Sequence, residues 1–151
     1  MSESAIPEIR LHNTASGKKE ILKTQTPGRL SMYSCGPTVY GFIHIGNLRA
    51  ALAADLFFRY FKSVGYDVTF VRNYTDVDDR IIKLAAEQGV TSEAFAARFV
   101  AEVEQDYAAA GLLEPTYKTT VTGHIKEIVA MIESILKNGH AYVVDGEVLF
   151  D

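Results

Sequence analysis

The run over residues 33–49, YSCGPTVYGFIHIGNLR, constrains this chain more than any other stretch. It places the tetrapeptide from His44 to Asn47 where a short strand should pass into a long helix. The backbone N–H groups of a first helical turn and the helix dipole together favour an anion such as phosphate. Gly46 would let the backbone approach that anion without a Cβ, and His44 and Asn47 could donate hydrogen bonds to it. The run therefore predicts a phosphate-binding strand, turn and helix.

The neighbouring residues predict a βαβ unit around this run. Strands are expected over 30–34 and 67–73, and an Ala- and Leu-rich helix over 47–64 should join them. Because its apolar residues cover much of its circumference, this helix should be well buried. Parallel sheets bind ligands beyond the carboxyl ends of their strands, which brings residues 35–47 and 73–79 to one rim.

Further elements are expected on both sides of this unit. Short strands are predicted near the start of the chain, helices in its middle and second half, and a hairpin around Asp145-Gly146, the strongest turn signal present. The predicted ranges are 9–12 and 19–22 for the strands, 78–88, 92–110 and 125–137 for the helices, and 141–144 with 147–150 for the hairpin. A hairpin is marginal alone, so the ending of the chain there is expected to be a truncation.

The composition argues against several classes of protein. The net charge of −4 and the lack of any basic cluster longer than Lys18-Lys19 argue against a nucleic-acid platform in this segment. A single cysteine excludes an internal disulfide framework and suits a reducing compartment. No apolar run is long enough to span a bilayer, and the N-terminus does not resemble a signal peptide. A cytoplasmic location is expected.

The string from Cys35 to Tyr40, CGPTVY, precedes the His44–Asn47 tetrapeptide. Together they resemble the first signature, His-Ile-Gly-His, of class I aminoacyl-tRNA synthetases, and within that class the cysteinyl-tRNA synthetase family. Asn47 stands where the class motif has its second His and keeps a donor of similar reach. The resemblance runs from Ile9 onward and includes a Thr-Asp-x-Asp-Asp string that begins at Thr75.

The resemblance implies an α/β fold, the first half of a class I synthetase Rossmann-type parallel sheet, followed by helices and a hairpin that open the connecting insertion. The implied divisions are an N-terminal extension over 1–30, the first half of the catalytic domain over 31–110 and the start of the insertion over 111–151.

The implied activity is ATP-dependent activation of L-cysteine to cysteinyl-adenylate, with Mg²⁺, and transfer of the cysteinyl group to tRNA-Cys. His44 and Asn47 would be the catalytic groups that hold the phosphates, and Gly46 and Tyr40 would join them in binding ATP. The residues implied in the pocket for the substrate cysteine are Cys35, Gly36, Thr38 and Thr75.

Cys35 is also implied as one ligand of a Zn²⁺ ion, with a Cys, a His and a Glu from beyond Asp151 completing the set. Without the resemblance, a lone cysteine is more often a small buried hydrophobe. The Lys-Met-Ser-Lys-Ser loop of the class is absent from the sequence, and tRNA would be bound through regions mostly outside it. The isolated 151-residue chain is therefore expected to be inactive.

Residues at the second strand end allow two interpretations. Asp76, Asp78 and Asp79 could hold Mg²⁺, but acidic residues are also typical of a first helical turn, with Asp76 in the N-cap region. Arg72 and Arg80 would then pair with them. Tyr33 and Tyr40 are expected in the core or at the rim.

Two alternative functions remain open at this point. An ATP-dependent cysteine ligase with an amino-sugar acceptor would share every motif present. A non-catalytic truncated paralogue could instead bind a nucleotide or a partner through an exposed sheet edge.

Overall fold

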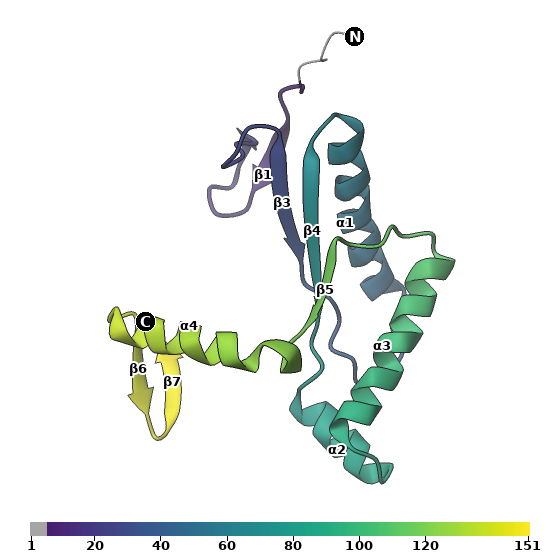
Figure 1. Cartoon of the computed structure of the whole chain (residues 1–151), viewed down its shortest axis with the longest axis vertical. Helices are drawn as coiled ribbons and strands as arrows, with labels where there is room; N and C mark the ends of the chain where they lie inside the picture. Colours follow the sequence, from purple (N-terminus) through teal and green to yellow (C-terminus); the bar gives the residue numbers. More distant parts are fainter. Residues whose placement is uncertain (1–5) are drawn as a thin grey trace.

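The computed structural model describes residues 6–151 and has a three-stranded parallel sheet at its centre (Figure 1). The strands are β3 (Arg29–Ser34), β4 (Asp67–Tyr74) and β5 (Tyr117–Thr120), in the order β3-β4-β5. Helix α1 (Ile45–Ser63) connects β3 to β4, so the predicted βαβ unit is confirmed.

The core lies on one face of this sheet. Side chains alternate along β4, and Phe70, Arg72 and Tyr74 are buried while the residues between them are partly exposed. Helices α1 and α3 (Ser92–Ala109) lie on the buried side (Figure 1). The sheet and its helices form the main apolar cluster, whose largest fully buried side chains are Tyr74, Ile81, Val39 and Val103.

The expectation that α1 is well buried is wrong. Its buried residues are Ala51, Asp55, Phe58 and Phe61, which lie on one side of the helix. Leu56 on the opposite side is 67% exposed. The helix contacts β3 and β4, and the apolar side chains of Leu52, Phe57 and Tyr60 are also exposed.

Helix α2 (Asp79–Glu87) begins two residues later than an N-cap at Asp76 would require. Its N-cap is Asp78, whose carboxylate accepts a hydrogen bond from the backbone N–H of Arg80 at 2.9 Å. The placement of Asp76 in the N-cap position is therefore wrong. Thr91 caps α3 by accepting from the backbone N–H of Ala94.

Strand β5 was not predicted, and it is the third strand of the sheet. It pairs in parallel with the carboxyl-terminal half of β4, with Val71 opposite Tyr117. Lys118 in β5 forms ion pairs at 2.5 Å with both Glu104 and Glu114. The division of the chain into 1–30, 31–110 and 111–151 stays a prediction, with β5 in the third segment.

The remaining elements are small and local. Strands β1 (Arg10–Asn13) and β2 (Lys18–Ile21) form a hairpin before the sheet. A 3₁₀ turn, η1 (Thr122–His124), leads from β5 into α4 (Ile125–Lys137), and β6 (Ala141–Val144) pairs with β7 (Glu147–Phe150). Helix α4 and this hairpin extend away from the sheet (Figure 1). Within residues 6–151, no helix has the length and apolar character to cross a membrane.

Candidate functional site

His44 and Asn47 together cap the N-terminus of α1. The Nδ1 atom of His44 accepts a hydrogen bond from the backbone N–H of Gly46 at 3.0 Å, and Asn47 Oδ1 accepts from the backbone N–H of His44 at 3.1 Å. This reciprocal arrangement is a capping box built from His and Asn. Because Nδ1 is the acceptor, the ring proton of neutral His44 lies on Nε2, which can donate to a ligand. The Nδ2 amide group of the Asn47 side chain offers two further N–H donors.

The backbone amides of this turn are less available than the sequence suggested. Those of Gly46 and Asn47 both donate within the turn, to the His44 side chain and the His44 carbonyl. Gly46 itself is required by the cap, because a Cβ there would lie 2.7 Å from Cε1 of the His44 ring. The glycine thus lets the imidazole fold back over the helix start.

A hollow of about 200 Å³ opens beside this cap. Its wall contains four of the residues expected to contact ATP or substrate: Thr38, Tyr40, His44 and Asn47. Tyr40 is 42% exposed at its rim, and the Arg80 guanidinium lies 4.1 Å from the centre of its ring. The structure therefore brings the polar cap, an aromatic ring and a cation around one cavity.

A second hollow of about 80 Å³ adjoins the first and shares Pro37 and Asn47 with it. Cys35 and Gly36 lie in its wall, and the thiol of Cys35 is exposed rather than buried in the core. The two hollows thus meet at Pro37 and Asn47, while Thr38 lines the first hollow and neither Gly46 nor Thr75 lines either one.

Arg72 also lines this second hollow, and it does not pair with the acidic cluster as expected. The guanidinium is packed between the rings of Phe70 and Tyr107, at 5.2 and 4.9 Å from their centres. Its Nη2 atom is buried and has no hydrogen-bond partner among the described residues. Burial raises the pKa of Tyr107, and the positive charge of nearby Arg72 partly offsets this rise.

The acidic cluster is used within the fold. Arg80 holds the Asp78 carboxylate through side-chain hydrogen bonds and lowers its pKa to about 2. Asp76 accepts hydrogen bonds from the backbone N–H and the hydroxyl of Thr122, which ties the end of β4 to η1. Among residues 6–151 no group of three or more His, Cys, Asp or Glu is placed to hold a metal ion.

Thr38 and Thr75 are brought together by a parallel β-bridge beyond the end of the sheet. The backbone N–H of Val39 donates to the Thr75 carbonyl at 3.1 Å, and that of Thr75 donates to the Pro37 carbonyl at 3.2 Å. Sequence reasoning missed the neighbouring Asn73, whose Oδ1 accepts from the backbone N–H of Gly36 at 2.9 Å. An Asn two residues before Thr75, at the end of the predicted strand, was the available signal for it.

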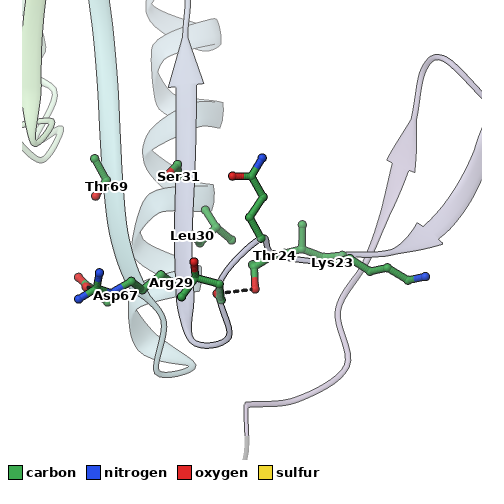
Figure 2. Close-up of a pocket in the computed structure, with 10 residues that line it drawn as sticks. Lys23, Thr24, Arg29, Leu30, Ser31, Asp67 and Thr69 are labelled. Atoms are coloured by element: carbon green, nitrogen blue, oxygen red, sulfur yellow. Dashed lines mark hydrogen bonds and ion pairs between the residues drawn. The ribbon is translucent and has the colours of Figure 1, made fainter.

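Larger hollows lie away from this rim. One of about 540 Å³ is lined by Lys23, Arg29, Ser31 and their neighbours at the amino ends of the strands (Figure 2). Another of about 870 Å³ follows the β1–β2 hairpin. Because parallel sheets bind ligands at the carboxyl ends of their strands, the two smaller hollows beside His44 and Cys35 form the candidate site.

Comparison with known proteins identifies the family of this chain. Residues 21–151 match the family described as the tRNA synthetases class I (C) catalytic domain. The chain belongs to this family, and the expected α/β fold of class I synthetases is confirmed.

Its relatives include the cysteine–tRNA ligases of Geobacter metallireducens and Geobacter sulfurreducens, each 49% identical, and that of Trichlorobacter lovleyi, which is 45% identical. Each similarity extends over 142 residues and 94% of this chain. The chain spans only 29% to 30% of the length of these relatives.

Proposed function

We propose that this chain provides the ATP- and cysteine-binding rim of a cysteine–tRNA ligase. The observation that carries the proposal is the pair of adjoining hollows that share Pro37 and Asn47. One contains the His44 cap and Tyr40, and the other contains Cys35 and Gly36. An enzyme that joins the carboxylate of an amino acid to the α-phosphate of ATP needs two such compartments in contact.

The reaction needs no protein nucleophile. In the first step a carboxylate oxygen of L-cysteine attacks the α-phosphorus of ATP, the bond to the β-phosphate breaks, and pyrophosphate leaves. In the second step a hydroxyl of the terminal adenosine of tRNA-Cys displaces AMP from the cysteinyl-adenylate. The Nε2–H group of His44 and the side-chain amide N–H groups of Asn47 would stabilise the phosphate charge as it develops. The capping box fixes the positions of both side chains.

Binding of the amino acid is assigned to Cys35, Gly36, Thr38 and Thr75. The bridge between the two threonines holds their hydroxyl-bearing residues side by side at the rim. The exposed thiol of Cys35 fits one position of a Zn²⁺ ion, whose other ligands would come from outside residues 6–151. When bound, zinc would favour the thiolate of cysteine over the hydroxyl of serine.

The acidic residues give little support for a protein-held Mg²⁺, because Asp76 and Asp78 already accept hydrogen bonds from Thr122 and Arg80. We propose that Mg²⁺ enters with the phosphates of ATP. An exposed, unpaired thiol at the rim suits a reducing compartment, which supports a cytoplasmic location.

Cysteine-dependent exchange of pyrophosphate into ATP tests the proposal, using the full product of the gene. Removing either donor, by His44→Ala or Asn47→Ala, should lower the exchange rate by about 10²–10³-fold, the usual cost of a lost transition-state donor. His140→Ala and Asn138→Ala, which lie beyond α4, are the matched controls and should leave the rate unchanged. Normal exchange by the His44 and Asn47 variants would contradict the assigned roles.

The molecule that accepts the cysteinyl group distinguishes the alternative functions. Transfer of cysteine to tRNA-Cys supports the ligase, whereas transfer to an amino sugar with no charging of tRNA would show the related cysteine ligase. Nucleotide binding without any exchange would indicate a non-catalytic paralogue. Residues 1–151 hold the His44–Asn47 signature and not the second, lysine-bearing phosphate loop, so we propose that by themselves they lack measurable exchange activity.

A further inference from the structure

The segment that carries Cys35 departs from regular pairing with β4. The last regular pair of the two strands is Ser34 with Arg72, and pairing resumes at Thr38 with Thr75. Three residues, Cys35 to Pro37, lie between these pairs on one strand, and two residues, Asn73 and Tyr74, on the other. The extra residue makes this segment a β-bulge, a feature that is rare in parallel pairs and that re-aims side chains next to active sites.

A bulge leaves backbone groups without their ladder partners, and here a side chain replaces one of them. The backbone N–H of Gly36 donates to Oδ1 of Asn73 at 2.9 Å, from a residue 37 positions away in the sequence. Before this bond the regular pairing ends at Ser34 with Arg72, and after it backbone hydrogen bonds join Pro37 and Val39 to Thr75. Asn73 thus completes the hydrogen bonding across the bulge.

Close packing limits how the bulge can move. A Cβ on Gly36 would collide with the backbone carbonyl of Asn73 and would also lie 3.5 Å from Cγ of Arg72. The backbone of Gly36 therefore lies directly against β4, and the hydrogen bond to the carboxamide of Asn73 holds it there. The residue before it, Cys35, is exposed in the wall of the smaller hollow, and its thiol donates to the backbone carbonyl of Gly36 at 3.4 Å.

We propose that Asn73 is a positioning residue, which sets the direction of Cys35 by accepting the hydrogen bond of the bulge at Gly36. It does not need to touch the substrate or a metal ion. The inference rests on the proposed function only where it assigns Cys35 to the cysteine pocket. The bulge and its hydrogen bond are independent of that assignment.

The test compares Asn73→Ala, which removes the acceptor, with Asn73→Asp, which keeps an oxygen at the same place. In the 151-residue chain, the Gly36 amide should exchange with solvent about tenfold faster in Asn73→Ala, as expected for the loss of one hydrogen bond. Asn73→Asp should keep the slow exchange. Asn138→Ala, at the C-cap of α4, is the matched control and should match the wild type.

Cys35 offers a second readout, because it is the only cysteine in the sequence. Its rate of alkylation by iodoacetamide should change several-fold in Asn73→Ala and stay near the wild-type rate in Asn73→Asp, with thermal unfolding used to confirm that both variants are folded. In the active gene product, Asn73→Ala should raise KM for cysteine more than KM for ATP.

The results separate the two proposals. Unchanged Gly36 exchange and Cys35 alkylation in Asn73→Ala would overturn the role of Asn73, and so would an Asn73→Asp variant that behaves like Asn73→Ala. If the wild-type gene product shows no cysteine-dependent exchange of pyrophosphate, the proposed function fails instead. The amide and thiol measurements would still decide whether Asn73 positions Cys35.

Discussion

The sheet with α1, α2 and α3, here called the body, differs from residues 125–150, here called the arm, in what holds each together. Helix α3 in the body buries five residues, whereas α4 in the arm buries none, although both carry apolar residues at helical spacing. Strands β6 and β7 pair only with each other, but β4 pairs with a strand on each side. A periodic pattern thus predicts a helix equally well in both regions, and burial depends on which partners the rest of the fold supplies.

Removing the same side chain in both regions gives the largest expected contrast. Ile81 in α2 is fully buried, and Ile128 in α4 is 37% exposed. Ile81→Ala should lower the free energy of unfolding by about 2–5 kcal/mol, and Ile128→Ala by less than about 1 kcal/mol, because only the first leaves a cavity. Urea unfolding measures both, and equal losses would show that the arm is packed as tightly as the body.

A glycine pair within the body comes next. Gly36→Ala pushes a methyl group into the backbone of Asn73 and should cost about 1–3 kcal/mol, a typical penalty for overpacking. Gly41→Ala is the control, since a Cβ there meets nothing within 4 Å. Equal unfolding midpoints for the two variants would contradict the tight packing of the Gly36 backbone against Asn73.

Asp55 tests a buried polar contact that the arm lacks. Its carboxylate accepts from the backbone N–H of Leu113 at 2.8 Å and from Nε of Arg59 at 2.6 Å. Asp55→Ala should cost about 1–3 kcal/mol, because it leaves a partly buried N–H without its acceptor. Glu133→Ala, an exposed acid in α4, should change the free energy of unfolding by less than about 0.5 kcal/mol. A neutral Asp55→Ala would show that the apolar contacts and the hydrogen bond from Arg59 Nη2 to the Gly111 carbonyl are enough to join α1 to the residues after α3.

The smallest effect concerns pH at the start of α2. Arg80 lowers the pKa of Asp78 to about 2 in the folded chain, below its ordinary value of 3.8. The stabilising effect of the Asp78 carboxylate is therefore fully present above pH 3.8 and is lost as the pH falls through 2. Thermal unfolding of wild type and Asp78→Ala should differ at pH 6 and converge near pH 2. In an Arg80→Ala background the convergence should occur at higher pH, and an unchanged midpoint would refute the pairing.

Much of the fold could be predicted because local signals agreed. The bounds of α4 and of the β6–β7 hairpin match the structure, since Ile and Leu spacing and the Asp145-Gly146 turn are unambiguous. Strand β5 was missed because four residues, YKTT, follow Pro115 without an apolar alternation. It forms a strand because β4 offers a free edge and Glu104 pairs with Lys118, and neither partner is close to it in the sequence.

The site was predicted in part for similar reasons. The strand, turn and helix around His44 followed from the sequence, but the use of His44 and Asn47 as a capping box did not, because such boxes usually begin with Ser or Thr. Arg72 was expected to meet the acidic cluster, yet strand alternation turns it inward between two aromatic rings. Three aspartates within four residues left the N-cap of α2 ambiguous. Asp78 takes this position, and its carboxylate also accepts a hydrogen bond from Nε of Arg80.

The bulge at Cys35 also changes which side chains of this segment face the core, the odd-numbered or the even-numbered ones. Along β3 the even-numbered Leu30 is buried against the helices, and the odd-numbered Tyr33 is exposed on the other face. Past the bulge the rule reverses, and odd-numbered Val39 is wholly buried in the core. Without the extra residue, Val39 would turn to solvent and Thr38 would turn into the apolar cluster. One inserted residue thus lets a single strand bury its valine while leaving a cysteine and a threonine on the rim.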